Sequence, residues 1–217
     1  ENVTISRIKM AQQLFALIDI NNCYVSCERV FNPKLNGQPV VVLSNNDGCV
    51  VSRSNEAKVL NIGMAIPWYE IEQRALAAGV KVFSSNYALY ADMSRRFFLI
   101  LEQHFHPDDL EPYSIDECFI QLSSYAEHFD VEQYCRVLIK RIEQWLGLPC
   151  CIGIGTTRTQ AKLANYFAKK RTGFDSVCYL PHLDLCSYES LLLETPASEI
   201  WGVGRKISKQ LQDYEIY

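Results

Sequence analysis

The chain has 217 residues, 48% of them hydrophobic and 21% charged, a balance typical of a folded globular protein with a buried core. It contains no apolar run as long as a membrane-spanning helix and no signal-peptide core, which predicts a cytoplasmic protein without membrane contact. The formal net charge of −4 excludes a uniformly basic surface, so contact with nucleic acid would require a local basic surface.

The cysteines and histidines show no metal-binding or disulfide pattern. Nine cysteines, an odd number without Cys-x-x-Cys spacing, predict reduced thiols in the core of a cytosolic protein. The four histidines are scattered and are predicted to lie at the surface: His104, His106, His128 and His182. Residues 1–13 are polar and are interpreted as an N-terminal extension, either natural or added to the protein.

An apolar, strand-like run at residues 14–20 contains one acid, Asp19. Apolar positions at helical spacing then predict a helix over residues 23–31. The amino terminus of this helix would lie just beyond Asp19, where its backbone amides favour an anion such as a triphosphate. Tyr24, in the first turn, is either a packing aromatic or a wall of a substrate pocket, and its position alone favours neither.

The following segment mixes short strands, turns and helices. The pattern predicts a strand, a polar turn, a helix, a second helix and a strand at residues 39–43, 44–48, 54–60, 67–78 and 80–83. Polar side chains gather around the start of the first helix: Ser52, Arg53, Asn55 and Lys58. This cluster would suit a phosphate contact, although without further support a solvated helix face is the favoured explanation.

A long helix is predicted over residues 86–105, followed by two adjacent acids, Asp116 and Glu117, in an apolar frame. Buried carboxylates require a partner, and no Lys or Arg occurs between residues 102 and 117. Neighbouring residues on a strand point to opposite faces, so the two acids can share a cation only at a strand end or turn.

Asp19 supplies a third carboxylate on a neighbouring strand. Ligand sets made only of oxygen favour a hard cation such as magnesium, and three carboxylates around magnesium suit phosphoryl transfer. Each acid alone is better explained as a turn cap or an ion-pair partner. For the adjacent pair in an apolar frame, the metal interpretation is favoured.

Residues 130–146 predict a helix whose inward side chains are Val131, Cys135, Leu138, Ile142 and Trp145, and residues 149–155 predict a strand. The next helix, residues 156–171, carries five basic side chains and no acid: Arg158, Lys162, Lys169, Lys170 and Arg171. We call these five the basic track, and their single sign favours phosphate binding over a solvated face. The order strand, helix, hairpin, helix, strand is the βαββαβ pattern of a ferredoxin-like α/β (α+β) fold.

Beyond residue 173 the chain predicts a short strand at residues 177–180 and a small helix at residues 185–193. A Gly-Val-Gly sequence then opens a last helix, with basic residues behind it: Gly202, Gly204, Arg205 and Lys206. Backbone amides exposed in this way can bind a DNA phosphate, as in a helix-hairpin-helix element. A lone Gly-x-Gly is weak evidence for this function.

Several of these segments together resemble the Y-family translesion DNA polymerases, and within them the UmuC type. The resemblance extends from Leu14 to about Leu211. The motifs that carry it are FALID at 15–19, PVVVLSNNDGCV at 39–50, FSSNYALYADMS at 83–94, YSIDE at 113–117, AKLAN at 161–165 and WGVG at 201–204. The SIDE sequence is specific for the family, and the SNNDGCV and SSNY sequences are specific for its UmuC branch.

The resemblance implies roles for individual residues. Asp19, Asp116 and Glu117 would be catalytic and would bind two Mg²⁺ ions, with the backbone carbonyl of Ile20 as a further ligand. Tyr24 would be the steric gate that excludes a ribonucleotide's 2′-hydroxyl. The incoming triphosphate would contact three further residues: Ser52, Lys58 and Lys169.

Two positions depart from the family pattern. Asn55, predicted to be a nucleotide-binding residue, stands where many relatives place a Tyr on the triphosphate. Cys23 replaces the aromatic residue that usually precedes the gate, which could loosen the floor under the nucleotide sugar.

The resemblance also implies a domain plan: a palm at residues 14–22 and 86–179, small fingers at residues 23–85 and a partial thumb at residues 180–217. The family's little finger is expected to be absent, as in a chain truncated within the thumb. Such a chain would hold DNA weakly, because the missing domain normally supplies much of the phosphate contact.

The first functional hypothesis is an error-prone DNA polymerase core of the SOS DNA-damage response. It would act on primer-template DNA and deoxynucleoside triphosphates, and by resemblance its partners would be a processed UmuD dimer and a recombinase filament. The alternative is a catalytically incompetent module that binds DNA or a partner. A metal-dependent nucleotide cyclase, whose palm shares the βαββαβ order, is a distant third hypothesis.

Overall fold

The computed structural model describes residues 13–217, so residues 1–12 of the predicted extension lie outside the described residues. The described chain forms two compact units. One contains residues 13–17, 119–135 and 152–217, and the other contains Ile18–Cys118 and Arg136–Cys151. Within residues 13–217, no helix combines the length and the apolar character needed to cross a membrane.

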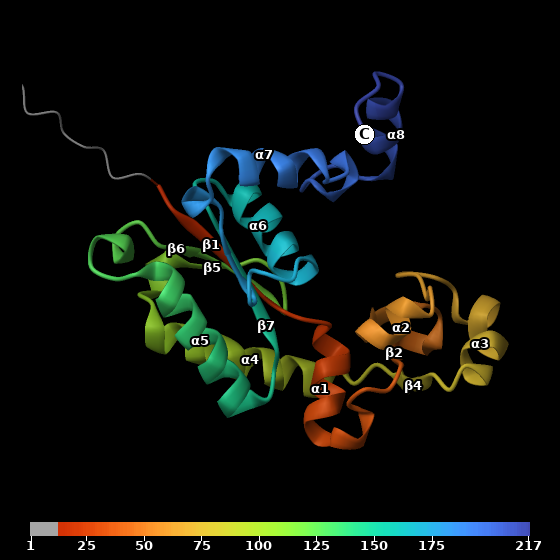
Figure 1. Cartoon of the computed structure of the whole chain (residues 1–217). Helices are drawn as coiled ribbons and strands as arrows, with labels where there is room; N and C mark the ends of the chain where they lie inside the picture. Colours follow the sequence, from red (N-terminus) through yellow and green to blue (C-terminus); the bar gives the residue numbers. More distant parts are fainter. Residues whose placement is uncertain (1–12) are drawn as a thin grey trace, which may run out of the picture. The chain divides into compact units, whose positions relative to one another are not determined.

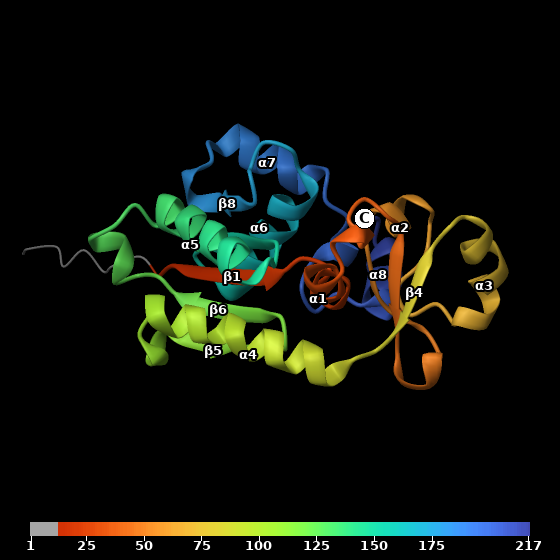
Figure 2. The ribbon, with the colours of Figure 1, turned by 90° about the horizontal axis from the view of Figure 1, so that it is seen from below.

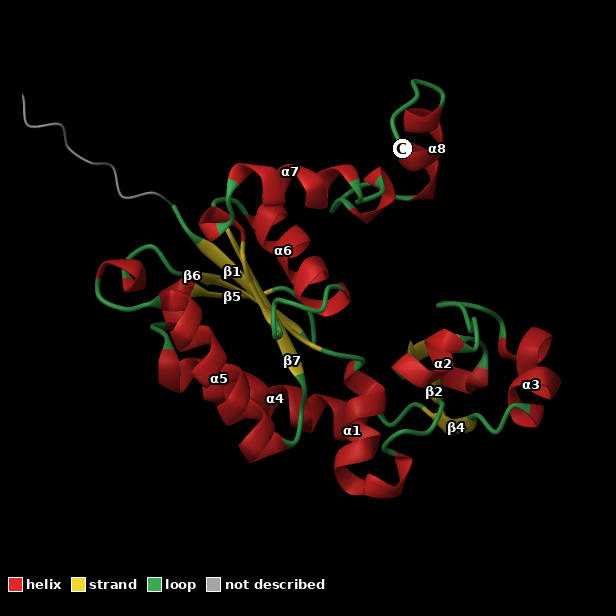
Figure 3. Ribbon diagram, viewed as in Figure 1, coloured by secondary structure: helices red, strands yellow, loops and turns green. Residues whose placement is uncertain are grey.

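The main sheet has five strands in the order β5-β6-β1-β7-β8. Figure 3 draws the strands in yellow. Their bounds are Leu110–Pro112, Glu117–Gln121, Phe15–Ile20, Cys150–Gly155 and Val177–Tyr179. Two helices complete the repeat, α4 at Tyr87–His104 and α5 at Val131–Leu146. In chain order β1, α4, β5, β6, α5 and β7 form a βαββαβ unit with the ferredoxin-like strand order, which confirms the predicted fold class.

In the first unit, helix α6 (Arg158–Lys170) packs on the central strands (Figure 1). Ala161 joins a buried cluster with Phe15, Leu17 and Phe119. The buried amide of Asn165 donates to the carbonyl oxygen of Leu17 at 3.2 Å, so a polar contact also ties the helix to β1. Thr157 caps the start of α6 by accepting from the backbone N–H of Gln160.

Gly153 in β7 allows this close helix packing. A Cβ added there would overlap the backbone of Asn165 and Ala161, and backbone cannot move aside cheaply. We expect Gly153→Ala to lower the free energy of unfolding by about 3 kcal/mol or more, measured by urea denaturation. Gly63→Ala is the matched control, because its added Cβ would meet only the side chain of Ile66 at 3.9 Å. Equal urea midpoints for Gly153→Ala and Gly63→Ala would contradict the explanation that Gly153 allows close packing of α6.

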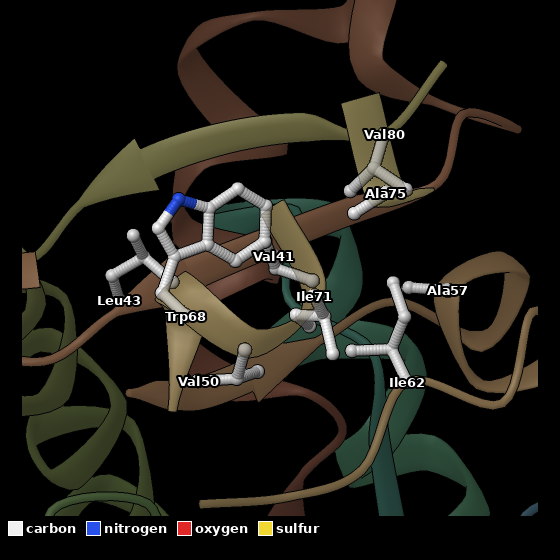
Figure 4. Close-up of a cluster of buried hydrophobic side chains, with 9 residues drawn as sticks. All are labelled: Val41, Leu43, Val50, Ala57, Ile62, Trp68, Ile71, Ala75 and Val80. Atoms are coloured by element: carbon white, nitrogen blue, oxygen red, sulfur yellow. The ribbon is translucent and has the colours of Figure 1, made fainter. Parts of the chain in front are cut away.

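The second unit contains a three-stranded sheet in the order β3-β2-β4, with bounds Val50–Arg53, Val40–Leu43 and Lys81–Ser84. β2 pairs antiparallel with β3 and parallel with β4. Helices α2 (Asn55–Val59) and α3 (Trp68–Ala77) supply apolar side chains to a core built around Trp68 (Figure 4). The buried members are Val41, Leu43, Val50, Ala57, Ile62, Trp68, Ile71, Ala75 and Val80.

Helix α1 (Cys23–Phe31) follows the end of β1 after a two-residue turn (Figure 2). It contacts α4, which buries an apolar stripe that includes Met93, Phe97, Ile100 and Leu101. Asn86 caps α4 by accepting from the N–H of Leu89. These contacts fix the direction in which the first turn of α1 leaves the strand.

The remaining helices are α7 (Leu185–Leu193) and α8 (Arg205–Gln212). Single turns of 3₁₀ helix lie at Pro33–Leu35, Asn45–Asp47, Pro107–Asp109, Tyr125–Glu127, Leu180–His182 and Ala197–Glu199. The last helix ends at Gln212.

Three sequence predictions need correction. Trp145 was expected to point inward, yet its side chain is 54% exposed and lies under the guanidinium of Arg141, 5.4 Å from the ring centroid. His104 is half-buried rather than superficial, and Nη1 of Arg141 lies 2.8 Å from its Nε2. Burial, with the nearby Arg141 charge, lowers the pKa of His104. Among the nine cysteines, all free in the described chain, Cys186 is exposed and Cys49 is only half-buried.

Candidate active site

Two of the predicted catalytic acids lie at adjoining strand ends. Asp19 is the penultimate residue of β1 and is only 8% exposed. The backbone N–H of Ile20, beside it, donates to the carbonyl oxygen of Asp116 at 3.0 Å. This hydrogen bond brings the backbone segments that carry Asp19 and Asp116 side by side, as the sequence predicted for neighbouring strands.

Asp116 and Glu117 lie where the hairpin turn meets β6. The backbone N–H groups of Tyr113 and Ser114 both donate to the carbonyl oxygen of Glu117, at 3.0 and 3.2 Å, and close the turn. The buried hydroxyl of Ser94 in α4 donates to the carbonyl oxygen of Ile115 and anchors the turn to the helix. Asp116 and Glu117 therefore lie in a turn and at a strand end, where neighbouring side chains need not point to opposite faces of the sheet.

Asp19 and Asp116 also act on a common group, the thiol of Cys23. A hydrogen bond with Cys27 and burial are the main causes that raise the pKa of this thiol, and the charges of Asp116 and Asp19 raise it further. Both carboxylates are therefore close enough to Cys23 to influence its ionisation.

The oxygen-only donor set suits a hard cation, but the side chains do not form a metal cage as they stand. The carboxylate of Asp116 accepts a hydrogen bond from the hydroxyl of Ser114 at 2.7 Å. Within residues 13–217, no three acidic, histidine or cysteine side chains are grouped to hold a metal ion. This hydrogen bond involves one of the two Asp116 carboxylate oxygens, Oδ1.

Tyr24 lies beside these acids in the first turn of α1. Its ring stacks on that of Tyr90 in α4, with centroids 4.4 Å apart and planes 11° from parallel. The ring of Tyr87 meets it edge-on at 5.9 Å. Burial raises the pKa of Tyr24, helped by Cys23, Tyr87 and Asp116, so the phenol is neutral at physiological pH.

The predicted phosphate cluster forms a network at the start of α1. Nζ of Lys58 donates to Oδ1 of Asn22 at 2.6 Å and to Oδ1 of Asn55 at 3.2 Å. Asn22, which precedes α1, has the left-handed backbone conformation with φ of 49°. Its amide nitrogen also contacts Oδ1 of Asn55 at 3.3 Å. The ammonium of Lys58 and the side-chain amides of Asn22 and Asn55 therefore meet at the residue that precedes α1.

Two other polar residues of the cluster have structural contacts. The hydroxyl of Ser52 is buried, accepts from the N–H of Val25 at 3.3 Å and donates to the carbonyl of Asn22 at 3.4 Å, so it stabilises the first turn of α1. The guanidinium of Arg53 bonds the carbonyl of Ile62 inside the same unit. The nucleotide contact of Ser52 stays a prediction.

The basic track lies in the other unit, on α6. The guanidinium of Arg158 covers the ring of Phe15 at 4.7 Å, and the ammonium of Lys162 lies 5.6 Å from the centroid of Trp201. Arg171 pairs with Glu194 at 2.7 Å. Lys169 is exposed in the last turn of α6. Its contact with a triphosphate stays a prediction.

The predicted DNA-binding loop opens α8 in the expected way. Gly202 has φ of 92°, a conformation that favours glycine, and Gly204 precedes the helix without a side-chain cap. A surface groove next to this start is lined by Ser198, Val203, Gly204, Arg205, Ser208, Lys209 and Gln212. Of the residues that the sequence assigned to a phosphate, Gly204 and Arg205 line this groove, whereas Gly202 and Lys206 do not.

The sequence pattern that defines the impB/mucB/samB family matches residues 18–166, which include all the predicted catalytic acids. The chain belongs to this family. Family membership confirms the resemblance noted from the motifs.

Individual relatives agree with this assignment. The chain is 44% identical to Protein ImpB of Salmonella typhimurium over 91% of its own length and 46% of that protein. It is 45% identical to Protein UmuC of Salmonella typhimurium strain LT2, with the same coverage of both chains. DNA polymerase IV 1 of Bacillus subtilis is 29% identical over 92% of the chain and 46% of that protein. The chain spans about half the length of the curated relatives it matches.

Solved structures share the fold at lower sequence identity. DinB from Sulfolobus solfataricus superposes with a TM-score of 0.77 at 21% identity, over 94% of this chain and 57% of that one. An insertion ternary complex of Dbh DNA polymerase gives a TM-score of 0.77 over 94% of this chain and 58% of that chain. The chain therefore shares the mixed α/β fold of these solved structures.

Four side chains at the site had no role predicted from the sequence: Asn22, Glu28, Tyr87 and Tyr90. Both tyrosines belong to the motif at 83–94 that marked the resemblance, so the motif was available as a signal. Asn22 directly precedes the helix predicted to begin at Cys23, a position at which Asn is a common cap.

Proposed function

We propose that the chain is the catalytic core of an error-prone translesion DNA polymerase that adds deoxynucleotides to a primer 3′-hydroxyl. The observation that supports this most strongly is the hydrogen bond from Ile20 to the carbonyl of Asp116, because it joins the two acid-bearing strand ends. The names of the relatives support the same reaction, since several are DNA polymerases.

The acids Asp19, Asp116 and Glu117, with the carbonyl of Ile20, would hold two Mg²⁺ ions. Hard carboxylate oxygens on a turn and two strand ends suit this cation. When bound, the ions would supply Lewis-acid stabilisation of the attacking and leaving oxygens. In their absence, the backbone hydrogen bonds at Ile20 and Glu117 already hold the segments that carry these acids together.

The other residues of this unit would bind and orient the nucleotide. The ammonium of Lys58, together with the amide of Asn55, would contact the triphosphate at the start of α1, where the helix amides also favour an anion. The ring of Tyr24, fixed on Tyr90, would occupy the space needed by a 2′-hydroxyl. Ser52 would support this arrangement by holding the first turn of α1.

Contacts with DNA and with partner proteins complete the proposal. The amides of Gly202 and Gly204, with Arg205 and Lys206, would hold a DNA phosphate beside α8. Lys169 would add a further triphosphate contact. By resemblance, a processed UmuD dimer and a recombinase filament would be partners in a cytoplasmic SOS response.

Template-directed extension tests the proposal. The 217-residue chain would be incubated with Mg²⁺, low salt and four primer-templates that differ only in the templating base, each with one deoxynucleotide at a time. We expect the complementary nucleotide to be added preferentially on every template. Binding of primer-template without any addition would contradict the proposal and favour a DNA-binding module.

A charge-removal variant tests the triphosphate contact of Lys58. We expect Lys58→Ala to raise the KM for deoxynucleotides about 10-fold, because it removes a charge-assisted hydrogen bond to the phosphates. Steady-state extension kinetics would measure this change. Lys81→Ala is the control, since Lys81 is exposed on β4. An unchanged KM for Lys58→Ala would assign the ammonium to holding Asn22 and Asn55 alone.

A further inference from the structure

Three tyrosines from two helices meet at the start of α1. Tyr24 comes from α1, and Tyr87 and Tyr90 come from the first turn of α4. Tyr90 forms the flat support under the ring of Tyr24, whereas Tyr87 closes the cluster edge-on, 6.2 Å from Tyr90 with planes 88° apart. Tyr90 is fully buried, whereas Tyr24 is half-buried and Tyr87 is 40% exposed. The most exposed rings therefore rest on a buried one.

A hydrogen bond fixes the supporting ring. The hydroxyl of Tyr90 donates to Oε1 of Glu28 at 2.7 Å. Glu28 is four residues after Tyr24 on α1, so both side chains lie on the same face of that helix. Tyr90 thus contacts this face twice, with its ring at Tyr24 and its hydroxyl at Glu28. Burial and this hydrogen bond raise the pKa of Tyr90, which keeps the hydroxyl protonated and able to donate.

Tyr90 supplies the face on which the Tyr24 ring stacks, whereas Tyr87 meets that ring edge-on. The adjacent residue, Cys23, has a small side chain that forms a hydrogen bond with Cys27. It offers no aromatic surface to support the Tyr24 ring. A ring that excludes a hydroxyl group must keep one orientation, and a half-buried tyrosine without a packed face can change rotamer. Stacking on a buried aromatic ring favours one rotamer of Tyr24 over its alternatives.

We propose that Tyr90, held by Glu28, is a positioning residue that fixes the Tyr24 ring and thereby sets the discrimination between deoxyribose and ribose. The inference rests on the proposed polymerase function and extends it to two residues that need not touch the nucleotide. It assigns sugar selectivity to a three-residue arrangement, Tyr24, Tyr90 and Glu28, rather than to Tyr24 alone.

Graded variants of the full chain test this inference through the ratio of ribonucleotide to deoxyribonucleotide kcat/KM. We expect Tyr90→Leu, which removes the stacked ring, to raise the ratio about 10-fold. Tyr90→Phe retains the ring and loses only the hydroxyl contact, so we expect a rise of about 3-fold. Glu28→Gln retains an acceptor oxygen and should stay near the wild-type ratio. Tyr69→Leu, at a ring that is 79% exposed on α3, is the control.

A second readout does not depend on catalysis. The chain would be produced with 3-fluorotyrosine, and the fluorine resonance of Tyr24 would be assigned from the Tyr24→Phe variant. We expect this resonance to shift or broaden in Tyr90→Leu and in Tyr90→Phe, and to stay unchanged in Tyr69→Leu. Tyr90→Phe keeps an aromatic ring in the core, so the comparison remains informative if the leucine variant fails to fold.

The two readouts separate the possible failures. A wild-type chain that adds no nucleotide, but whose Tyr24 resonance changes in the Tyr90 variants, would overturn the proposed function and support the positioning of Tyr24. A wild-type chain that extends primers, but whose sugar ratio and Tyr24 resonance are the same in all Tyr90 variants, would overturn the inference. Changes in kcat for both nucleotides by the same factor would likewise contradict it.

Discussion

Replacing Asp116 and Glu117 with Ala is expected to lower nucleotide incorporation about 1,000-fold or more without unfolding the protein. This loss corresponds to about 4 kcal/mol of transition-state stabilisation, the scale of a metal site that polarises phosphoryl oxygens. The fold should persist because the turn is held by backbone groups, namely the carbonyls of Ile115, Asp116 and Glu117, which alanine retains.

The measurement is single-nucleotide primer extension, with circular dichroism and urea unfolding as tests of the fold. Glu102→Ala is a suitable control, because Glu102 is an exposed acid on α4 in the same unit. Its replacement removes one negative charge, as does each of the two replacements in the double variant. Incorporation that survives in the double variant would remove the metal assignment. Loss in the Glu102 control would point to an effect of net charge on DNA binding instead.

The Tyr24→Ala variant is expected to lose most of its selectivity for deoxyribonucleotides, by about 100-fold. Removing the ring opens a space on Tyr90 that a 2′-hydroxyl can fill, and steric exclusion by one side chain is worth about this much. Because the phosphate cluster of Lys58 and Asn55 is formed without Tyr24, the kcat/KM for deoxynucleotides should fall far less than the selectivity.

Competition between a ribonucleotide and the matching deoxyribonucleotide at one template base measures this selectivity. Tyr24→Phe serves as the matched control, since the ring remains and only the hydroxyl is lost. If Tyr24→Ala keeps the wild-type selectivity, Tyr24 is a packing residue of the α1 and α4 interface and not a gate.

Hydrophobic periodicity predicted the succession of elements well, because each helix and strand buries one face. The stripe of α4 and the Asp-interrupted strand β1 are local patterns of this kind. The βαββαβ order then restricted the sheet to a ferredoxin-like arrangement, which the strand order confirms. Periodicity predicted wrongly that Trp145 points inward. Its side chain, in the last turn of α5, is largely exposed and lies against the guanidinium of Arg141.

The site was predicted as a set of residues but not as a set of contacts. Asn22, Asn55 and Lys58 meet across 33 to 36 positions in the sequence, and no local pattern encodes such a network. Tyr90 and Glu28 are 62 positions apart, and each alone is consistent with an ordinary helix residue. The hydrogen bond from the Ser114 hydroxyl to the Asp116 carboxylate likewise depends on a side-chain rotamer that a sequence does not specify.

Nucleotidyl transfer to a primer end releases one pyrophosphate for each nucleotide added, so counting pyrophosphate tests the proposed polymerase function most directly. Pyrophosphate would be counted per chain with a primer ending in a 3′-hydroxyl and with the same primer ending in a dideoxynucleotide. We predict one pyrophosphate for each primer extended, and none with the dideoxy primer or the Asp116→Ala variant. Pyrophosphate released equally with both primers would contradict the account, because it would indicate cyclisation or hydrolysis of the triphosphate.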